Sequence, residues 1–121
     1  MLREVGQLNA ADAAWERGYE LYQELAKKRP QSHDYQNSLG YHEIVGGNLR
    51  MAENRAPDAI PPLESAQATF TALVAGNPSV PMFRTNLTEA QLALVWALNT
   101  AGRKADALQL SNRAIENARQ A

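Results

Sequence analysis

The stretch GNPSVPMFRTNLTEAQLALVWALNTAGRKADALQLSNRA, residues 76–114, decides the fold class of this chain. It opens with Gly76-Asn77-Pro78, a combination that ends helices, and a second break follows at Ala101-Gly102-Arg103. Between the breaks, apolar residues recur three and four positions apart, which predicts an amphipathic helix from about Val80 to Thr100, capped by Ser79. Its predicted buried stripe comprises Phe83, Leu87, Ala90, Leu94, Val95 and Leu98.

The rest of the chain follows the same alternation of helices and stops. It is rich in good helix formers and has no alternating β-branched runs, so we predict no strand. Pro61 and Pro62 leave two alternatives for the third helix, which is either kinked or begins only at Ile60. The other predicted helices span about Ala10–Lys28 after an Asn9 cap, His33–Glu53 after a Ser32 cap, Pro57–Ala75, and Lys104–Arg119. We expect inward positions at Leu8, Ala11, Trp15, Tyr22 and Leu25 in the first helix, and at Ala107, Leu108, Ala114 and Ile115 in the last.

The chain repeats itself with an offset of 48 residues. The residues that match lie at predicted core positions, turns and stops, and the alignment needs no gap. The chain therefore holds half a unit at about 9–29 and whole units at about 32–76 and 79–120, in one domain over residues 1–121. Matching pairs are Leu25 with Leu73, Pro30 with Pro78, Tyr35 with Phe83, Leu39 with Leu87, Arg55 with Arg103, Asp58 with Asp106, Ala59 with Ala107, Ile60 with Leu108, and Ala66 with Ala114.

These units resemble the tetratricopeptide repeat family, which places small residues where its two helices approach closely. The last unit supplies Gly102 at the turn, and the preceding unit supplies Gly47 in the middle of its first helix. Three departures occur: Asn54 replaces the turn glycine, Val95 replaces a small residue, and Gly46 replaces a large apolar one. Small residues at the family's other positions are Ala59, Ala66, Ala107 and Ala114.

The unit length is similar to that of the extended, kinesin-light-chain-like repeats. The elements Asn77-Pro78-Ser79-Val80, Phe83 to Leu87, and Gly102-Arg103 to Ala107 look most like repeats joined to bacterial serine/threonine kinase domains. The resemblance implies antiparallel helix pairs stacked as a short right-handed superhelix of about two and a half repeats. It also implies a protein-binding scaffold, either as a fragment or as a regulatory module of a larger bacterial signalling protein.

Composition excludes several classes of function. The net charge of -1 gives no field of one sign, so we expect neither nucleic acid nor a membrane surface as partner. Without cysteine, disulfide and thiol chemistry are absent. No apolar run reaches the roughly 18 residues of a membrane span, and residues 1–7 contain no signal core, so we expect a cytoplasmic protein.

Candidate catalytic groups are few, and we predict no enzymatic activity, metal or cofactor. His33 precedes Asp34 at a helix start, where an imidazole is usually a solvated surface group. His42 has no second histidine four residues away, so it lacks the spacing of a metal pair. No phosphate-binding loop or nucleophile elbow is present, since Gly46-Gly47 lies within a predicted helix.

The resemblance directs the search for a binding site to the first helix of each unit, which lines the inner wall of such stacks. There, amide side chains and large aromatics suit the recognition of a peptide. The predicted groove residues are Asn37, Tyr41, Ile44, Asn48 and Met51 on the second helix, and Thr85, Glu89, Leu92, Trp96 and Asn99 on the fourth. The alternative for Tyr41 and Trp96 is packing against neighbouring helices.

Self-association is the second hypothesis for function. The last helix has apolar residues on different faces, and the first has Trp15, Tyr19 and Tyr22. Stacked repeats normally finish with a polar helix, so either end of this chain is a candidate for homodimerisation.

Overall fold

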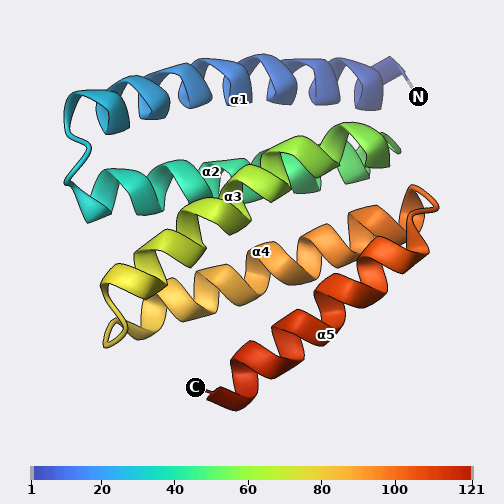
Figure 1. Ribbon diagram of the computed structural model, residues 1–121. Coiled ribbons are helices and arrows are strands. Elements are labelled where there is room, and N and C mark those ends of the chain that lie inside the picture. The colour runs from blue at the N-terminus through green and yellow to red at the C-terminus, as the bar shows by residue number, and fades with distance from the viewer. Residues whose placement is uncertain (1, 121) are drawn as a thin grey trace.

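The computed structural model describes the backbone of residues 2–120 and the side chains of residues 10–119. In this part the chain forms five helices and no strand, so the all-helical class predicted from the sequence is confirmed (Figure 1). The helices are α1 (Leu2–Lys28), α2 (His33–Ala52), α3 (Ala56–Gly76), α4 (Pro81–Thr100) and α5 (Lys104–Gln120).

The helices lie in a row in which each one contacts the next along the chain. In Figure 1, α3 crosses in front of α2, and α3 packs against both α2 and α4. The two helices α2 and α4 also contact each other. Within the described residues, α1 packs only on α2, and α5 packs only on α4. The outer flanks of α1 and α5 therefore have no helix against them.

Helix boundaries follow local capping, with two differences from the sequence prediction. Ser32 caps α2 as predicted, because its hydroxyl accepts a hydrogen bond from the Tyr35 amide at 3.3 Å. The predicted cap at Asn9 is wrong, because α1 already begins at Leu2. The predicted cap at Ser79 is also wrong, because Val80 occupies the position before Pro81, which begins α4. The predicted inward position of Leu8 lies outside the described side chains.

The third helix runs without interruption through its two prolines. It begins at Ala56, so the alternative of a start at Ile60 is wrong. Pro61 and Pro62 have no amide hydrogen, which leaves the carbonyls of Pro57 and Asp58 without their helical donors. Both of these residues are exposed, so water can satisfy their carbonyls, and the helix tolerates two prolines near its start.

The two turns within the units have the same geometry at the 48-residue offset. The amide of Arg55 donates to the carbonyl of Arg50 at 2.8 Å, and that of Arg103 donates to Leu98 at 2.8 Å. Each turn needs one residue with positive φ, which is Asn54 at 60° in the first and Gly102 at 85° in the second. Asparagine tolerates this conformation better than most residues, which explains how Asn54 replaces glycine there.

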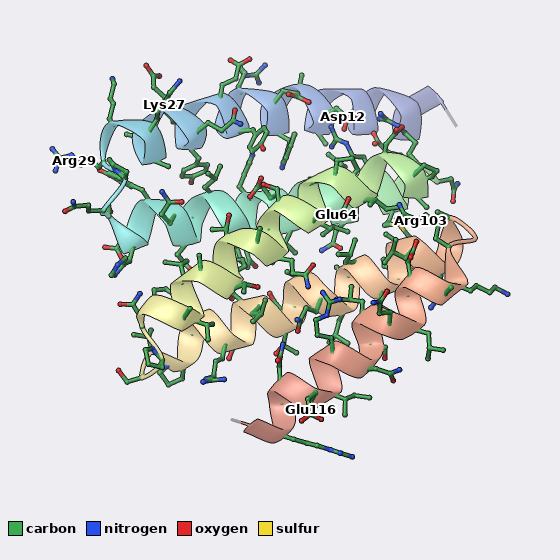
Figure 2. All side chains as sticks on the ribbon, in the orientation of Figure 1. Asp12, Lys27, Arg29, Glu64, Arg103 and Glu116 are labelled. Atoms are coloured by element: carbon green, nitrogen blue, oxygen red, sulfur yellow. The ribbon has the colours of Figure 1, made fainter. Side chains whose placement is uncertain are left out.

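The core consists of two clusters of buried side chains, one at each end of the pair formed by α3 and α4. Charged residues such as Lys27, Arg29 and Glu116 are exposed and lie at the outer edges (Figure 2). One cluster comprises Met51, Ala56, Ala59, Ile60, Leu63, Leu94, Ala97, Leu98, Ala107 and Leu110. The other comprises Ile44, Ala66, Phe70, Leu73, Phe83, Leu87 and Ala90.

Glycines in α2 make room for the two largest buried side chains of α3. A Cβ atom at Gly47 would collide with Leu63, and one at Gly40 would lie 2.8 Å from the Phe70 ring. Both Leu63 and Phe70 are fully buried. The close approach of α2 and α3 therefore requires glycine at these two positions.

The last helix differs from its predicted inward face. Ala107 is buried as predicted, but Leu108 is 64% exposed and Ile115 is 52% exposed. Leu110 is buried in their place. The prediction for Leu108 is wrong because its counterpart Ile60 is covered by α4, whereas no helix follows α5 in the described chain.

Candidate interaction face

Most of the predicted groove residues lie on the surface of α2 and α4. Tyr41 is 51% exposed and Trp96 is 55% exposed, so a large part of each side chain stays accessible beside any packing against neighbouring helices. Leu92 is exposed as well. Asn37 is half-buried. The remaining exposed members of the predicted set are Asn48, Thr85, Glu89 and Asn99.

Two predicted groove residues are in the core instead. Ile44 is only 4% exposed and belongs to the cluster around Phe70, and Met51 is only 7% exposed. They were assigned by analogy with α4, but α4 itself covers this side of α2. Val45, which the sequence prediction missed, is 43% exposed and takes the position between Tyr41 and Asn48.

The exposed residues of α2 and α4 face the same side of the molecule. Because α3 packs against both helices, the exposed stripes are the sides turned away from α3. On α2 the stripe comprises Tyr41, Val45 and Asn48, at spacings of four and three residues. On α4 it comprises Thr85, Glu89 and Trp96. We call these six residues the α2–α4 face.

One hydrogen bond between side chains joins the two helices beside this face. The amide nitrogen of Asn86 donates to the amide oxygen of Asn37 at 2.8 Å. Asn86 is only 8% exposed, so the bond fixes how α2 and α4 sit against each other. The amide oxygen of Asn37 is therefore already hydrogen-bonded to α4, so Asn37 has a structural role in place of the predicted role of binding a peptide.

A pocket extends the α2–α4 face towards α1. Its volume is about 320 Å³. Tyr22 of α1 contributes one wall, which the sequence analysis did not predict because it depends on how α1 packs beside α2. The lining combines aromatic surface with hydroxyl, amide and imidazole groups, a mixture that suits peptide side chains and backbone. The lining residues are Tyr22, Asn37, Ser38, Tyr41, His42 and Val45.

Trp15 and His42 hold the wall of this pocket in place. The Trp15 indole donates to the carbonyl of His42 at 2.7 Å, and the His42 ring nitrogen Nε2 lies 2.8 Å from the carbonyl of Trp15. The two rings stack with centroids 5.1 Å apart. A Cβ at Gly46 would collide with the indole, so the contact between Trp15 and α2 requires glycine at that position.

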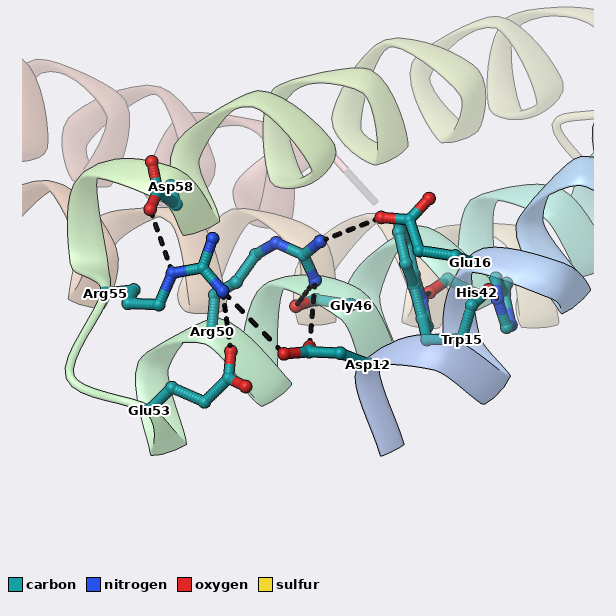
Figure 3. Close-up of polar contacts among 9 residues, drawn as sticks. All are labelled: Asp12, Trp15, Glu16, His42, Gly46, Arg50, Glu53, Arg55 and Asp58. Carbon is teal, nitrogen blue, oxygen red and sulfur yellow. Dashed lines mark hydrogen bonds and ion pairs between the residues drawn. The ribbon is translucent and has the colours of Figure 1, made fainter. Parts of the chain in front are cut away.

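A charged network fastens α1 to the end of α2 (Figure 3). The Arg50 guanidinium lies 3.3 Å from Glu16 and 4.0 Å from Asp12, and it also lies over the Trp15 ring at 4.6 Å. Arg55 reaches Asp12 at 3.8 Å. A hydrogen bond with Asp12 raises the pKa of the Glu53 carboxyl, and partial burial acts in the same direction.

A buried carboxyl lies between α1 and α3. Glu43 is 1% exposed, and one of its oxygens accepts a hydrogen bond from the Tyr19 hydroxyl at 2.9 Å. Burial raises the pKa of Glu43 above its ordinary value, although the hydroxyls of Ser65 and Tyr19 act against this. Burial, and then the nearby Glu43 charge, raise the pKa of Tyr19 to about 12. Because Glu43 is enclosed and no ligand can reach it, its protonation affects the stability of the fold and not binding.

Searches for other kinds of site in the described residues gave two further findings. No three His, Cys, Asp or Glu side chains are grouped there in a way that could hold a metal ion. None of the described helices combines the length and the apolar character needed to cross a membrane. His33 is exposed, with its ring edge-on to Phe83 at 6.3 Å.

Comparisons with protein-family models, with curated proteins and with solved structures find no match to this chain. The case for a function therefore depends on the α2–α4 face and its pocket.

Proposed function

We propose that this chain is a non-catalytic protein-interaction module that binds a peptide segment of a partner protein along the α2–α4 face. The observation that supports this most is the exposure of Tyr41 at 51% and Trp96 at 55% on two helices that contact each other. Large aromatics with polar groups are the residues that most often dominate binding energy at protein interfaces.

The polar residues between these aromatics fit the same role. Asn48 presents both a donor and an acceptor, which can pair with the two polar groups of one peptide bond. Val45 and the adjoining pocket offer an apolar position for one side chain of the peptide. The two stripes are short, so we expect contact with a few peptide residues and an affinity at the weak end for protein interfaces.

The resemblance to tetratricopeptide repeats supports the proposal from a second direction. In that family the first helix of each unit lines the inner wall of the stack, and here α2 and α4 are those helices. The contact between α2 and α4, with α3 packed on the opposite side, is what such an arrangement requires. A cytoplasmic role in bacterial signalling is part of the same proposal.

The test is a selection of binding peptides from a phage-displayed random library, followed by fluorescence anisotropy with the selected peptide. We expect Trp96→Ala and Asn48→Ala to weaken binding while leaving helicity unchanged, with a loss of about tenfold or more for Trp96→Ala. Leu108→Ala is the matched control, because Leu108 is similarly exposed but lies on α5. Binding that is unchanged in both face variants rejects the proposal.

Homodimerisation is the second candidate, and a specific observation favours it. Leu92, Leu108 and Ile115 are 63%, 64% and 52% exposed near the end of the row of helices. Exposed apolar patches of this kind often mark protein contacts. Sedimentation over a range of concentrations decides, because a dimer that Leu108→Glu abolishes supports self-association and a monomer at all concentrations rejects it.

A further inference from the structure

The outer flank of α4 and α5 has apolar residues at positions that are covered in the preceding unit. Ile44 and Ile60 are 4% and 5% exposed. Their counterparts at the 48-residue offset, Leu92 and Leu108, are also aliphatic but are 63% and 64% exposed. Both units therefore have aliphatic side chains at these two positions, but they are buried in the first unit and exposed to solvent in the second.

The helix that covers the first pair is α4. Ile44 lies in one buried cluster with Phe83, Leu87 and Ala90 of α4. Ile60 lies in the other cluster with Leu94 and Leu98 of α4. The structure thus shows what kind of helix fits this flank: one with Phe, Leu, Ala and Leu spaced four, three and four residues apart, as α4 has from Phe83 to Leu94.

Other differences between α3 and α5 are compensated inside the unit. Where α2 and α3 pair Gly47 with the large Leu63, the equivalent residues are the larger Val95 and the smaller Ser111. Likewise Gly40 with Phe70 becomes Thr88 with Ala118, and these last two line one narrow crevice between α4 and α5. The small residues Ser111 and Ala118 of α5 therefore offset the larger residues Val95 and Thr88 of α4. These exchanges do not change the outer flank.

The charge on this flank indicates the orientation of a helix bound there. Lys104 is exposed at the position where Ala56 is buried against the cluster of Leu98. Because α4 runs antiparallel to α3, the C-terminal end of α4 lies near Ala56 (Figure 1). A lysine at this place favours the negative, C-terminal end of a docked helix.

We propose that the flank formed by Leu92, Leu108 and Ile115 binds an amphipathic helix of a partner protein. This helix runs antiparallel to α5, places its C-terminal end near Lys104, and presents the apolar pattern of α4. Leu92 lies one helical turn before Trp96 on α4, so this site borders the α2–α4 face, whereas Leu108 and Ile115 lie on α5.

The first experiment uses a synthetic peptide with the sequence of residues 81–100 as the probe, added to the complete chain. We expect amide NMR shifts on α5 and at Leu92, and a dissociation constant that Leu108→Glu raises at least about tenfold. Tyr41→Ala is the matched control, because Tyr41 is 51% exposed but lies on α2, and this change leaves the binding unchanged. Shifts confined to the α2–α4 face, or binding insensitive to Leu108→Glu, overturn the proposal.

The second experiment tethers the helix to the chain, so that docking can be observed even when the affinity of the free peptide is low. A copy of residues 74–100 is appended directly after Ala121, which reproduces the spacing of the repeat because Leu73 and Ala121 are equivalent. Tethering raises the effective concentration to about the millimolar range. We expect a higher thermal midpoint and protection of the appended helix from proteolysis, both lost with Leu92→Glu and Leu108→Glu together.

The outcomes of the two experiments separate the possible occupants. Absence of docking in the tethered chain overturns the proposal whatever the affinity of the free peptide. Docking of the tethered helix without binding of the free peptide at millimolar concentration overturns the claim of a partner protein, since the flank then takes only a continuation of its own chain. A dimer that Leu108→Glu dissociates assigns the flank to a second copy and also overturns it.

Discussion

Exchanging the Gly47 and Leu63 pair for the residues found one unit later tests how each helix pair packs. The perturbation is Gly47→Val together with Leu63→Ser, which copies Val95 and Ser111 into the first whole unit. Leu63 is fully buried, and a Cβ at Gly47 would collide with it. The two single variants should therefore be damaging for opposite reasons, one leaving a void and the other overfilling the contact.

The magnitudes follow from burial. Truncating a fully buried leucine costs about 2–5 kcal/mol in unfolding free energy, and we expect about 3–4 kcal/mol for Leu63→Ser. Overfilling a packed contact costs about 1–3 kcal/mol, and the better helix propensity of valine offsets about 0.5 kcal/mol of this. The two single losses therefore sum to about 3.5–6.5 kcal/mol, whereas mutual compensation of about 1–3 kcal/mol should leave the double variant less damaged than that sum.

The assay is urea unfolding followed by circular dichroism at 222 nm for the wild type, both singles and the double variant. The coupling free energy is obtained from the four midpoints and slopes. Pro57→Ala, at an exposed position on the same helix, serves as a control for changes in α3 that do not reach the contact. Additive losses, with no coupling between positions 47 and 63, would refute the reasoning that units exchange volume between paired helices.

Three further predictions concern stability and are measured by chemical or thermal unfolding. The folded state holds the Glu43 proton more tightly than the unfolded state, so wild-type stability should fall as pH rises from the ordinary glutamate range through the raised pKa of Glu43. Glu43→Gln should remove that loss, whereas Glu64→Gln at an exposed position should not, and an unchanged pH profile for Glu43→Gln contradicts the account. Trp15→Ala should cost about 3–5 kcal/mol because it removes a buried ring and its bond to His42, and a cost under about 1 kcal/mol would mean that α1 is not anchored there. Gly102→Ala should cost about 1 kcal/mol or more because Gly102 has a φ of 85°, and an unaffected midpoint would show that the turn relaxes.

The fold class was predictable because the sequence marks its own helices. The apolar spacing from Phe83 to Leu98, the stop at Asn77 and the cap at Ser32 act locally, and the structure confirms each of them. The start of α1 was missed because Asn9 resembles a cap, although the helix continues through it to Leu2. Capping residues are common inside helices as well, and no local feature distinguishes the two cases.

The candidate site was only partly predictable, because exposure depends on which neighbour is present. Ile44 and Leu92 stand at equivalent positions, but α4 covers the first and no described helix covers the second. Leu108 was predicted to be buried, but it is exposed because no described helix covers it as α4 covers its counterpart Ile60. The contribution of Tyr22 to the pocket arises from the packing of α1 beside α2, which a repeat pattern does not encode.

Gly46 and Val95 are two positions at which the sequence departs from the repeat pattern that it resembles, and the packing bears on both. Gly46 makes room for the indole of Trp15. Val95 and the small Ser111 are the residues one unit later at the positions where Gly47 faces Leu63. In each case the volume of one helix is matched by its partner. A residue-by-residue comparison of the units therefore understates their similarity. What the units share is the total side-chain volume of the two residues at each contact between helices.

Whether the α2–α4 face binds peptides is tested most directly by NMR of the isotopically labelled chain, titrated with a peptide selected from the random library. We expect the largest shift changes at the backbone of Tyr41 and Asn48 and at the indole of Trp96, with α5 unaffected. Saturable changes that leave the signals of these three residues in place, or no change at millimolar peptide, would rule out peptide binding at this face.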